Sequence, residues 1–393
     1  MTHVTTHDDV SAIAHSPNGR QALHSTSDTP ELGLIDMFSR DGLPSLHGDK
    51  HFQRRRLESK LFTKQARAKM EYEILLPVLR RHLAEHLASS ESGEADLMPF
   101  SRLILARLSG AIVGTPPVDD VEAAERLRVL SEQIMNGLAS QFPWVTGDTA
   151  EYARVGLEAR QTFHDEYYLP GKELSDPYGV IGLLLSNQDA VPDEDVRFRE
   201  SMLFLIGSSS TTANALPHTI IELERWLESR PERRGDLASF EFCRRAASEA
   251  LRLHPPNPGL IRSILEPMTL PSGLELEEGE FVFLDLRAAG QDVTVFGPNA
   301  GEYDPLREVP EGVWPFALTF GGGPHMCIGR TLTIGDHGAK EDPEAPQGVL
   351  VQLLHELYDW GLRLDSSRSP RFREALGRDD FATFPVIFTR AAG

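Results

Sequence analysis

The sequence has only two cysteines in 393 residues, Cys243 and Cys327. Two cysteines this far apart do not make a disulfide framework, which favours a protein of the reducing cytoplasm. Long apolar runs are also missing, because stretches such as 180–185 and 202–206 are far too short to cross a bilayer. The first ten residues carry neither a basic nor an apolar segment, so we expect no signal peptide and no membrane anchor.

Basic residues are scarce relative to acidic ones, 39 against 59, and the formal net charge is −20. Such a charge argues against nucleic acid or an anionic membrane as a partner. The stretch from Arg54 to Lys69 is the exception, because it holds seven basic residues and one acidic residue, Glu58. This stretch is either the solvated face of a helix or a docking patch for an acidic protein.

Internal repeats, low-complexity tracts, linkers and nucleotide-binding fingerprints are absent from the sequence. Apolar residues recur at helical spacing in 54–90, 121–140, 151–168, 195–228 and 238–254. Runs typical of strands come later, at 260–265, 280–286 and 384–389, and 290–325 has the composition of a long ordered loop. We therefore expect one domain over residues 1–393, mostly α with a small β part.

The chemistry-bearing motif surrounds Cys327, with Phe320, Gly321, Gly323, His325 and Gly329 at fixed spacing around it. A cysteine thiolate can ligate haem iron and push electron density onto it. Glycines allow the backbone to turn tightly and leave amides free to point at the sulfur. The alternative is a glycine-rich turn beside an inert buried cysteine, but six residues at these positions favour the ligand.

This motif resembles the haem-binding loop of the cytochrome P450 family, and the chain is similar to the soluble bacterial members of that family. The resemblance implies the cytochrome P450 fold, with haem b (iron protoporphyrin IX) held between an oxygen-binding helix and the cysteine loop. It also implies that Cys327 is the iron ligand and that Phe320, Gly321, His325 and Gly329 contact the cofactor.

A second match is Glu249-Ala-Leu-Arg252, followed by Leu-His-Pro-Pro. Glutamate and arginine three residues apart share one side of a helix and can pair, although an isolated pair of this kind is usually a surface feature. With the Pro-Pro exit the segment resembles the family's helix K. The resemblance implies that Arg307 joins Glu249 and Arg252 in a buried structural network.

Haem carboxylates need cationic partners, and arginine suits them because its planar fork binds both oxygens. His51 and Arg55 resemble the pair at the start of the family's helix C that contacts the propionates. Arg262 resembles the arginine of the strand after helix K, and His325 is the fourth such residue. All four occur in the family's order.

The segment 205–214 resembles the family's oxygen-binding helix I but departs from its pattern. Ser210 stands where the family usually has an acid, and Thr211 stands at the usual hydroxyl residue. A carboxylate can exchange protons with solvent, whereas a serine can only relay them through its hydroxyl. Ser210 and Thr211 are therefore the candidate catalytic residues for proton delivery.

Two further departures concern the ends of the resemblance. His51 lies much earlier than the equivalent histidine of relatives, so we expect the usual first helix and first two strands to be missing, with the chain starting near helix B. After the cysteine loop, residues 335–346 interrupt the expected helix L, and a helical pattern resumes at Val349. The end of the chain, from Phe384, resembles the family's last β-hairpin.

The resemblance implies a monooxygenase of secondary metabolism that takes electrons from a separate ferredoxin and its reductase. The alternatives are a peroxide-driven or non-redox haem-thiolate enzyme, for which Ser210 is the argument, and a non-catalytic relative, against which the intact cysteine loop argues. The small organic substrate is expected to contact residues of helix I and of the segment after helix K, namely Ile206, Gly207, Pro258, Gly259 and Leu260.

Overall fold

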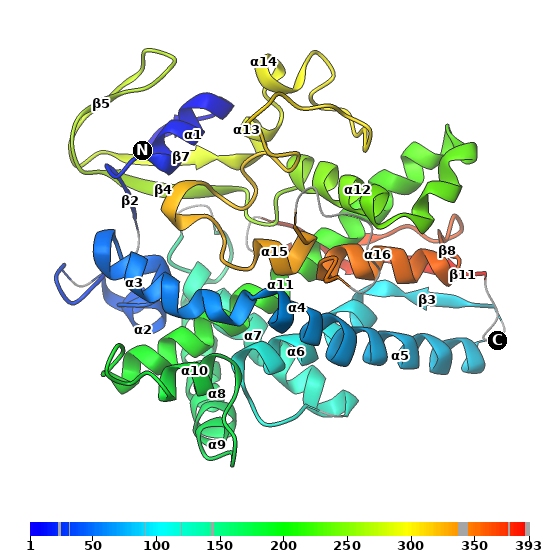
Figure 1. Ribbon diagram of the computed structural model, residues 1–393, viewed down its shortest axis with the longest axis horizontal. Helices are drawn as coiled ribbons and strands as arrows, with labels where there is room; N and C mark the ends of the chain where they lie inside the picture. The colour runs from blue at the N-terminus through cyan, green and yellow to red at the C-terminus, as the bar shows by residue number, and fades with distance from the viewer. Residues whose placement is uncertain are drawn as a thin grey trace.

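The computed structural model describes residues 1–22, 25–30, 32–90, 92–118, 120–142, 145–336, 345–375 and 378–389, with the backbone alone given for 373–375 and 378–380. Helices dominate these residues (Figure 1). In the first half they are α1 (His7–His15), α2 (Asp36–Ser39), α3 (Gly48–Glu58), α4 (Lys64–Lys69), α5 (Leu76–Ser89), α6 (Leu97–Val113), α7 (Val121–Ala139), α8 (Thr149–Phe163), α9 (Leu169–Lys172) and α10 (Gly179–Leu185). The second half contains α11 (Glu194–Glu228), α12 (Phe240–Leu253), α13 (Leu286–Gly290), α14 (Val293–Phe296), α15 (Arg330–Ile334) and α16 (Val349–Asp359).

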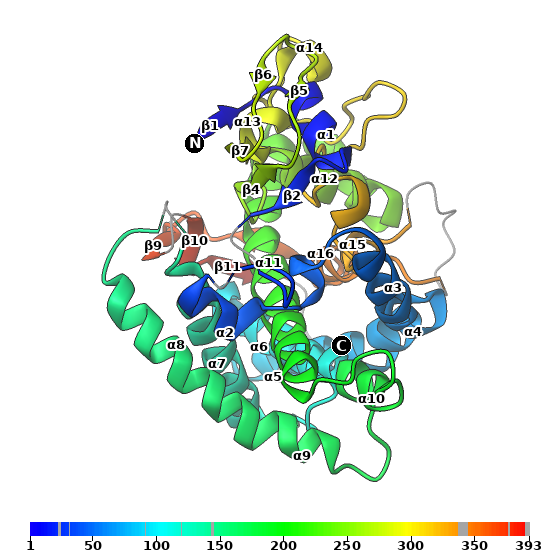
Figure 2. The same ribbon diagram turned by 90° about the vertical axis from the view of Figure 1, so that its left-hand side faces the viewer.

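The 35-residue helix α11 runs through the middle of the molecule and organises the rest (Figure 2). It starts where the Asp193 side chain accepts a hydrogen bond from the Asp195 amide, which satisfies one of the free amides of the first turn. Helices α6, α7, α12 and α16 pack around it. Its apolar positions are buried against α6, α12 and α16 in the largest core cluster and against α7 in a second cluster, and this burial fixes the cavity-facing side of α11.

A four-stranded sheet lies at the N-terminal end of the molecule, in the order β1-β7-β4-β2. Its strands are β1 (Thr2–Val4), β7 (Phe281–Asp285), β4 (Gly259–Ile264) and β2 (Gly19–Gln21), with β1 and β7 parallel and the other pairs antiparallel. Helix α1 covers this sheet through Val10 and Ile13. The sheet joins the first twenty residues to the segment after α12, and thereby places β4 beside the cysteine loop.

The remaining strands form smaller sheets. They are β3 (Glu94–Asp96), β11 (Pro385–Phe388) and β8 (Leu362–Leu364) in one sheet, β9 (Arg371–Ala375) with β10 (Arg378–Thr383), and β5 (Met268–Thr269) with β6 (Glu275–Leu276). The expected fold class, mostly α with a small β part, is confirmed, and the strands expected at 260–265, 280–286 and 384–389 are β4, β7 and β11. In the described ranges, every helix is too short or too polar to span a membrane.

The helical pattern expected over 54–90 is divided in the structure. After α3, a short turn leads to α4, a π-helical turn (Met70–Leu75) and α5. Helix α15 ends at Ile334, with Gly335 as its C-cap, and α16 starts at Val349, as expected for an interruption of helix L. Of the interrupting segment 335–346, residues 337–344 lie outside the described residues. His51 and Arg55 of α3 lie close to His325 of the cysteine loop.

Candidate functional site

Cys327 sits in a tight loop that leads into α15. Its amide donates a hydrogen bond to the Phe320 carbonyl oxygen at 2.7 Å. Gly321 and Gly323 have φ angles of 71° and 59°, in the left-handed region that favours glycine. A Cβ atom on Gly323 would lie 2.5 Å from the carbonyl oxygen of Ala14, so the loop packs directly on α1. Gly321 and Gly323 are therefore required by the backbone of this loop.

The Cys327 side chain faces a cavity, which gives it accessible surface although protein surrounds the loop. Burial raises the pKa of its thiol above the ordinary value. The amides of Gly329 and Arg330 point at the sulfur, and they lower the pKa together with the charges of Arg55 and Arg330. Donors and cations aimed at a sulfur stabilise its thiolate, which is the form that binds a metal.

The cavity in front of Cys327 measures about 440 Å³ and is largely apolar. One wall is the cysteine loop with α15, a second is α6, and a third is α11. The α11 residues that line it are Glu200, Leu203, Phe204, Gly207, Ser208, Thr211, Thr212 and Ala215. A large apolar cavity with a few polar groups is the usual form of a small-molecule or cofactor site.

The hydroxyls of α11 differ in which way they face. Thr211 and Ser208 line the cavity, and their hydroxyls donate to the Gly207 and Phe204 carbonyls at 3.0 and 2.7 Å. Ser210 is outside the cavity lining, and its hydroxyl donates to the Ile206 carbonyl at 3.3 Å. Such bonds to the preceding turn weaken helical bonding locally. Of the two candidate catalytic residues, the fold thus brings Thr211 to the cavity and leaves Ser210 on a neighbouring face.

Four basic side chains converge at the cavity edge next to the cysteine loop: His51 and Arg55 from α3, Arg262 from β4, and His325. The rings of His51 and His325 lie 4.1 Å apart. Arg262 is 1 % exposed, donates to Gln21 and to the Ile261 carbonyl, and leaves its Nε without a partner. Within the described part of the chain, none of the four forms an ion pair with a carboxylate.

The pKa values of this cationic cluster reflect that crowding. Burial, then the nearby positive groups, lower the pKa of His51 to about 4 and that of His325 to about 3. Burial lowers the pKa of Arg262 to about 10. Buried cations without an anion are unfavourable. The cluster is consequently suited to a ligand that brings its own carboxylates, as a haem does with its two propionates.

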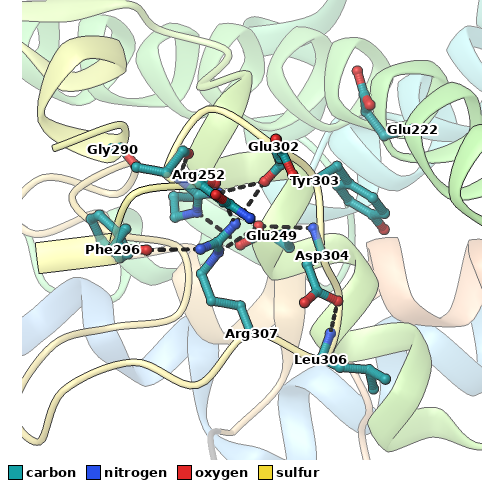
Figure 3. A network of polar contacts seen from close by, with 12 residues as sticks. Glu222, Glu249, Arg252, Gly290, Phe296, Glu302, Tyr303, Asp304, Leu306 and Arg307 are labelled. Carbon is teal, nitrogen blue, oxygen red and sulfur yellow. Dashed lines mark hydrogen bonds and ion pairs between the residues drawn. The ribbon is translucent and has the colours of Figure 1, made fainter. Parts of the chain in front are cut away.

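A buried ion network joins α12 to the segment 290–307, which precedes the cysteine loop in the chain (Figure 3). Arg252 donates to both carboxylate oxygens of Glu249, at 2.7 and 2.6 Å, and Arg307 Nε donates to the same carboxylate at 3.0 Å. The two arginines also donate to five backbone carbonyls, those of Gly290, Phe296, Asn299, Ala300 and Glu302. The fold brings together the three residues expected in this network, and they tie α12 to the segment that leads to the cysteine loop.

A second buried ionic cluster lies on the cavity wall, and the sequence reasoning missed it. Glu200 accepts from the Leu43 amide at 2.9 Å and from Arg54 Nη1 at 3.0 Å, and the same Arg54 atom lies 3.8 Å from Glu58. Glu58 is fully buried, and both of its carboxylate oxygens lack a hydrogen-bond partner. Burial and the neighbouring Glu200 charge raise the pKa of Glu58 well above its usual value. The one signal in the sequence is that Glu200 precedes Gly207 by seven residues, which places both on the same face of a helix.

The basic stretch from Arg54 to Lys69 is split between the interior and the surface. Arg54 and Arg55 face inward, and Arg67 is buried, donating to the Thr331 carbonyl and to Asp336. The other four basic residues, Arg56, Lys60, Lys64 and Lys69, are exposed. Phe52, one turn before Arg56, is 65 % exposed beside them. A solvated helix face and a docking patch both remain compatible with this arrangement.

Of the residues expected to contact a substrate, some line the cavity and others do not. Gly207 and Leu260 line the cavity, as do Phe320, Gly321, His325 and Gly329 of the loop. Ile206 and Gly259 are buried outside its lining, and Pro258 lines a second, much smaller cavity. A Cβ on Gly259 would lie 2.1 Å from the ring of Phe283, so this glycine allows β4 to pack against β7.

Comparison with known proteins adds three findings. A sequence model described as cytochrome P450 matches residues 20–334. Human cytochrome P450 4F12 is 30 % identical over 194 residues, 43 % of this chain and 37 % of that protein. Indoleacetaldoxime dehydratase of Arabidopsis thaliana is 26 % identical over 343 residues, 77 % of this chain and 66 % of that protein. The chain thus spans less than two thirds of the length of these relatives.

Solved structures share the fold at low sequence identity. P450BioI, in complex with an acyl carrier protein ligated to hexadec-9Z-enoic acid, superposes with a TM-score of 0.76 at 19 % identity. The match covers 98 % of this chain and 91 % of that one. CYP109E1 from Bacillus megaterium in complex with corticosterone gives 0.72 at 19 % identity, covering 98 % and 92 %.

Proposed function

Because this chain belongs to the cytochrome P450 family, we propose that it is a haem-thiolate monooxygenase of secondary metabolism that oxidises a small, largely apolar molecule. Family membership implies a haem cofactor, and we propose haem b. The observation that supports this most strongly is Cys327, which faces an apolar cavity with two backbone amides directed at its sulfur. In this proposal residues 1–393 act as a single haem-binding domain.

The chain offers a complete set of contacts for the cofactor. Cys327 would ligate the iron, with Phe320, Gly321 and Gly329 forming the loop around the ligand. Arg55 and Arg262 would neutralise the propionates, with the rings of His51 and His325 as further hydrogen-bonding groups, and the unpartnered Nε of Arg262 is a donor available for one of them. When bound, a thiolate-ligated haem supplies the activation of dioxygen.

The protein residues on the opposite wall govern protons and substrate. Monooxygenation consumes two electrons and two protons for each oxygen atom inserted. The Thr211 hydroxyl lies in the cavity and can pass a proton through ordered water, whereas Ser210, outside the cavity lining, can contribute only indirectly. Gly207 leaves open space in the cavity, since no atom lies within 4 Å of a Cβ placed on it. The apolar side chains of α6 and α11 would hold the substrate and limit water.

Electrons must come from another protein, and we propose a ferredoxin with its reductase. The exposed residues Arg56, Lys60, Lys64 and Lys69 lie on α3 and α4 and the turn that joins them, on the same elements that carry Arg55 and Arg67 toward the cysteine loop. A basic patch steers an acidic partner and sets its orientation. The exposed ring of Phe52 would provide an apolar anchor at the edge of this patch.

A second candidate is a haem-thiolate enzyme that does not activate dioxygen reductively. Two observations favour it. Ser210 stands where the family usually has an acid, and Ser210 is outside the cavity lining. The plant relative is named a dehydratase. Such an enzyme would use the same haem contacts and cavity and would need no ferredoxin. A non-catalytic role is a weaker alternative, because the cysteine loop is intact.

Two measurements test the proposal. The reduced, carbon monoxide-bound wild type should show the red-shifted band of thiolate-ligated haem, and Cys327→Ala and Cys327→His should lose it. With a candidate substrate, ferredoxin, reductase and dioxygen should give oxygenated product in a fixed ratio to the reductant consumed. Turnover with peroxide alone, or without any oxidant, would select the second candidate. Retention of the band in Cys327→Ala would overturn the ligand assignment.

A further inference from the structure

Thr211 lacks a nearby acid from which to replenish its proton. Among the described residues that line the large cavity, Glu200 is the one carboxylate, and it is bonded to Arg54 and to the Leu43 amide. Glu200 also precedes Thr211 by eleven residues, about 16 Å along a helix that rises 1.5 Å per residue. Ser210, at the usual acid position, is outside the cavity. If Thr211 delivers protons, they must reach it by another route.

Titratable side chains continue along α11 on the C-terminal side of Thr211. His218 and Glu222 follow at intervals of seven and four residues, which places all three on one face of the helix. Helical side chains lean toward the N-terminus, so His218 is directed toward the turn that carries Asn214 and thus toward Thr211. Residue 218 is 6 % exposed, and a buried histidine at this position needs a structural or chemical reason.

His254, at the end of α12, connects His218 to the surface. Its ring stacks on that of His218, with centroids 4.7 Å apart and an interplanar angle of 12°. His254 Nε2 lies 3.0 Å from Glu222 Oε1, and the hydrogen bond lowers the pKa of Glu222 below its usual value. The side chains of His254 and Glu222 are 27 % and 18 % exposed, so both reach solvent.

A small cavity completes the connection on the interior side. It measures about 10 Å³ and is lined by Asn214, His218, His254, Arg287 and three prolines. This is close to the space that one water molecule needs, and four of the seven residues that line the cavity are polar, as the site of a buried water requires. Pro256 lines this cavity and also the large one, so the two are neighbours.

We propose that Glu222, His254 and His218, with a water molecule in the small cavity, form a proton uptake route from the surface to the end of the large cavity that holds Thr211. This proposal rests on the monooxygenase function proposed above and deepens it. Histidine suits such a route because its ordinary pKa lies near neutrality, and it can accept a proton on one ring nitrogen while releasing one from the other.

Each passage along the route takes up one proton at the surface and delivers one proton at the interior end. A proton from solvent binds to Glu222 or to His254; the ring of His254 gives its other N–H proton to the water, and the water gives one of its own to His218. His218 then releases a proton toward a water molecule in the large cavity beside Thr211, so one proton has entered from solvent and one has left toward Thr211. The other charged groups in contact are Arg225, 3.6 Å from Glu222, and Arg287 at the small cavity.

If His218 had a purely structural role, its substitution would have a different effect. His218 also packs at 4.9 Å from the ring of Phe381, so it could serve only as a buried ring. In that case His218→Phe would preserve function, because it keeps a ring that can stack on His254. Under the proposed route this substitution removes the proton carrier while retaining the packing, and Glu222→Gln removes the surface acceptor without touching the core.

The first test is the yield of product per reductant consumed, with ferredoxin and reductase. His218→Phe and Glu222→Gln should lower it by about tenfold, less than the 10²–10⁴-fold that a group transferring the proton directly contributes. Their peroxide-driven turnover should match wild type, because hydrogen peroxide brings both protons with it. His3→Phe, a substitution of an exposed histidine whose ring lies 5.2 Å from that of Phe283 in the sheet, is the matched control.

The second test does not depend on activity. A high-resolution crystal structure of the haem-bound wild type should show an ordered water in the small cavity, within hydrogen-bond distance of His218 or His254. A dry cavity, or unchanged coupling in both variants, would overturn the route. If the wild type itself fails to couple reductant to product, the monooxygenase proposal fails, and the crystal structure still decides whether the water is present.

Discussion

The ion network that joins α12 to the segment 290–307 permits a quantitative prediction for Arg252. This side chain is completely buried and donates five hydrogen bonds, two to Glu249 and three to backbone carbonyls. Arg252→Ala leaves three carbonyls without that donor, and Glu249 keeps Arg307 and the Asp304 amide as partners. Breaking a buried ion pair costs about 3–5 kcal/mol. Because domains are stable by only about 5–15 kcal/mol, we expect a loss of about 4 kcal/mol and poor haem incorporation.

Arg307 provides a graded comparison within the same network. Its side chain is 11 % exposed, and Arg307→Ala leaves the two-pronged pair of Glu249 and Arg252 intact. Two of the carbonyl contacts that it loses lie at the surface, where water can replace the guanidinium. We therefore expect a loss of only about 1–2 kcal/mol. Arg126→Ala, which breaks an exposed ion pair with Glu166, is the control and should have no measurable effect.

The assay is urea unfolding followed by tryptophan fluorescence, together with haem content per chain. Arg252→Ala should unfold at a much lower urea concentration than Arg307→Ala and should bind less haem after expression. Equal losses in the two variants would refute the argument, since burial would then not determine the cost. A variant that holds haem normally but does not turn over would instead indicate a direct chemical role for Arg252.

Four further predictions concern other parts of the molecule. Gly335→Ala should destabilise far more than Gly273→Ala, because both glycines have positive φ but only at Gly335 would the new methyl meet a backbone oxygen at 2.2 Å. Glu58→Gln should be more stable than wild type at pH 7–8 and equal to it near pH 4. The raised pKa of Glu58 makes the folded protein retain this proton, whereas the unfolded chain releases it above about pH 4.3, so the stability of wild type falls as the pH rises. Lys64→Glu should raise the ferredoxin concentration for half-maximal turnover about fivefold at low salt and less at high salt. Thr211→Ala should reduce product per reductant and increase peroxide release, by up to the 10²–10⁴-fold attributed to a positioned proton donor.

Each of these has a definite contrary result. Thermal unfolding that does not distinguish the two glycine variants would contradict the packing argument at Gly335. A Glu58→Gln protein whose stability parallels that of wild type from pH 4 to 8 would show that Glu58 is ionised in the fold. A salt-independent effect of Lys64→Glu would argue against electrostatic docking. Coupled turnover that survives Thr211→Ala would exclude Thr211 as the proton donor, whichever oxidant is used.

Local motifs carried most of what could be predicted about the site. The cysteine loop spans ten residues, and two of its glycines, Gly321 and Gly323, are required by their positive φ angles, Gly323 also by its close approach to α1. The pair Glu249 and Arg252 lies within one helical turn. For such features, spacing along the chain fixes spacing in the structure. Their distant partner Arg307 was found only through the resemblance, because 58 residues separate it from Glu249.

Features that depend on long-range packing were not predictable in this way. Glu200 and Arg54 are 146 residues apart, and nothing in either segment indicates that these two side chains meet. The basic stretch looked uniform, yet the fold turns Arg67 inward to bind the backbone of α15. Likewise His218 and His254 read as ordinary helix residues until α11 and α12 bring their rings into contact.

The sequence by itself determined the fold class and the cysteine loop, because these follow from periodicity and from a short motif whose geometry is local. The four basic residues expected at a haem came from the resemblance alone, since they lie in distant segments of the chain. The tertiary structure decided which hydroxyl of α11 enters the cavity. Thr211 and Ser210 are adjacent in the chain, but neighbouring helical residues point about 100° apart. The rotation of α11 is fixed by burying its apolar side against α6, α12 and α16. That packing turns Thr211 toward Cys327 and Ser210 away from it.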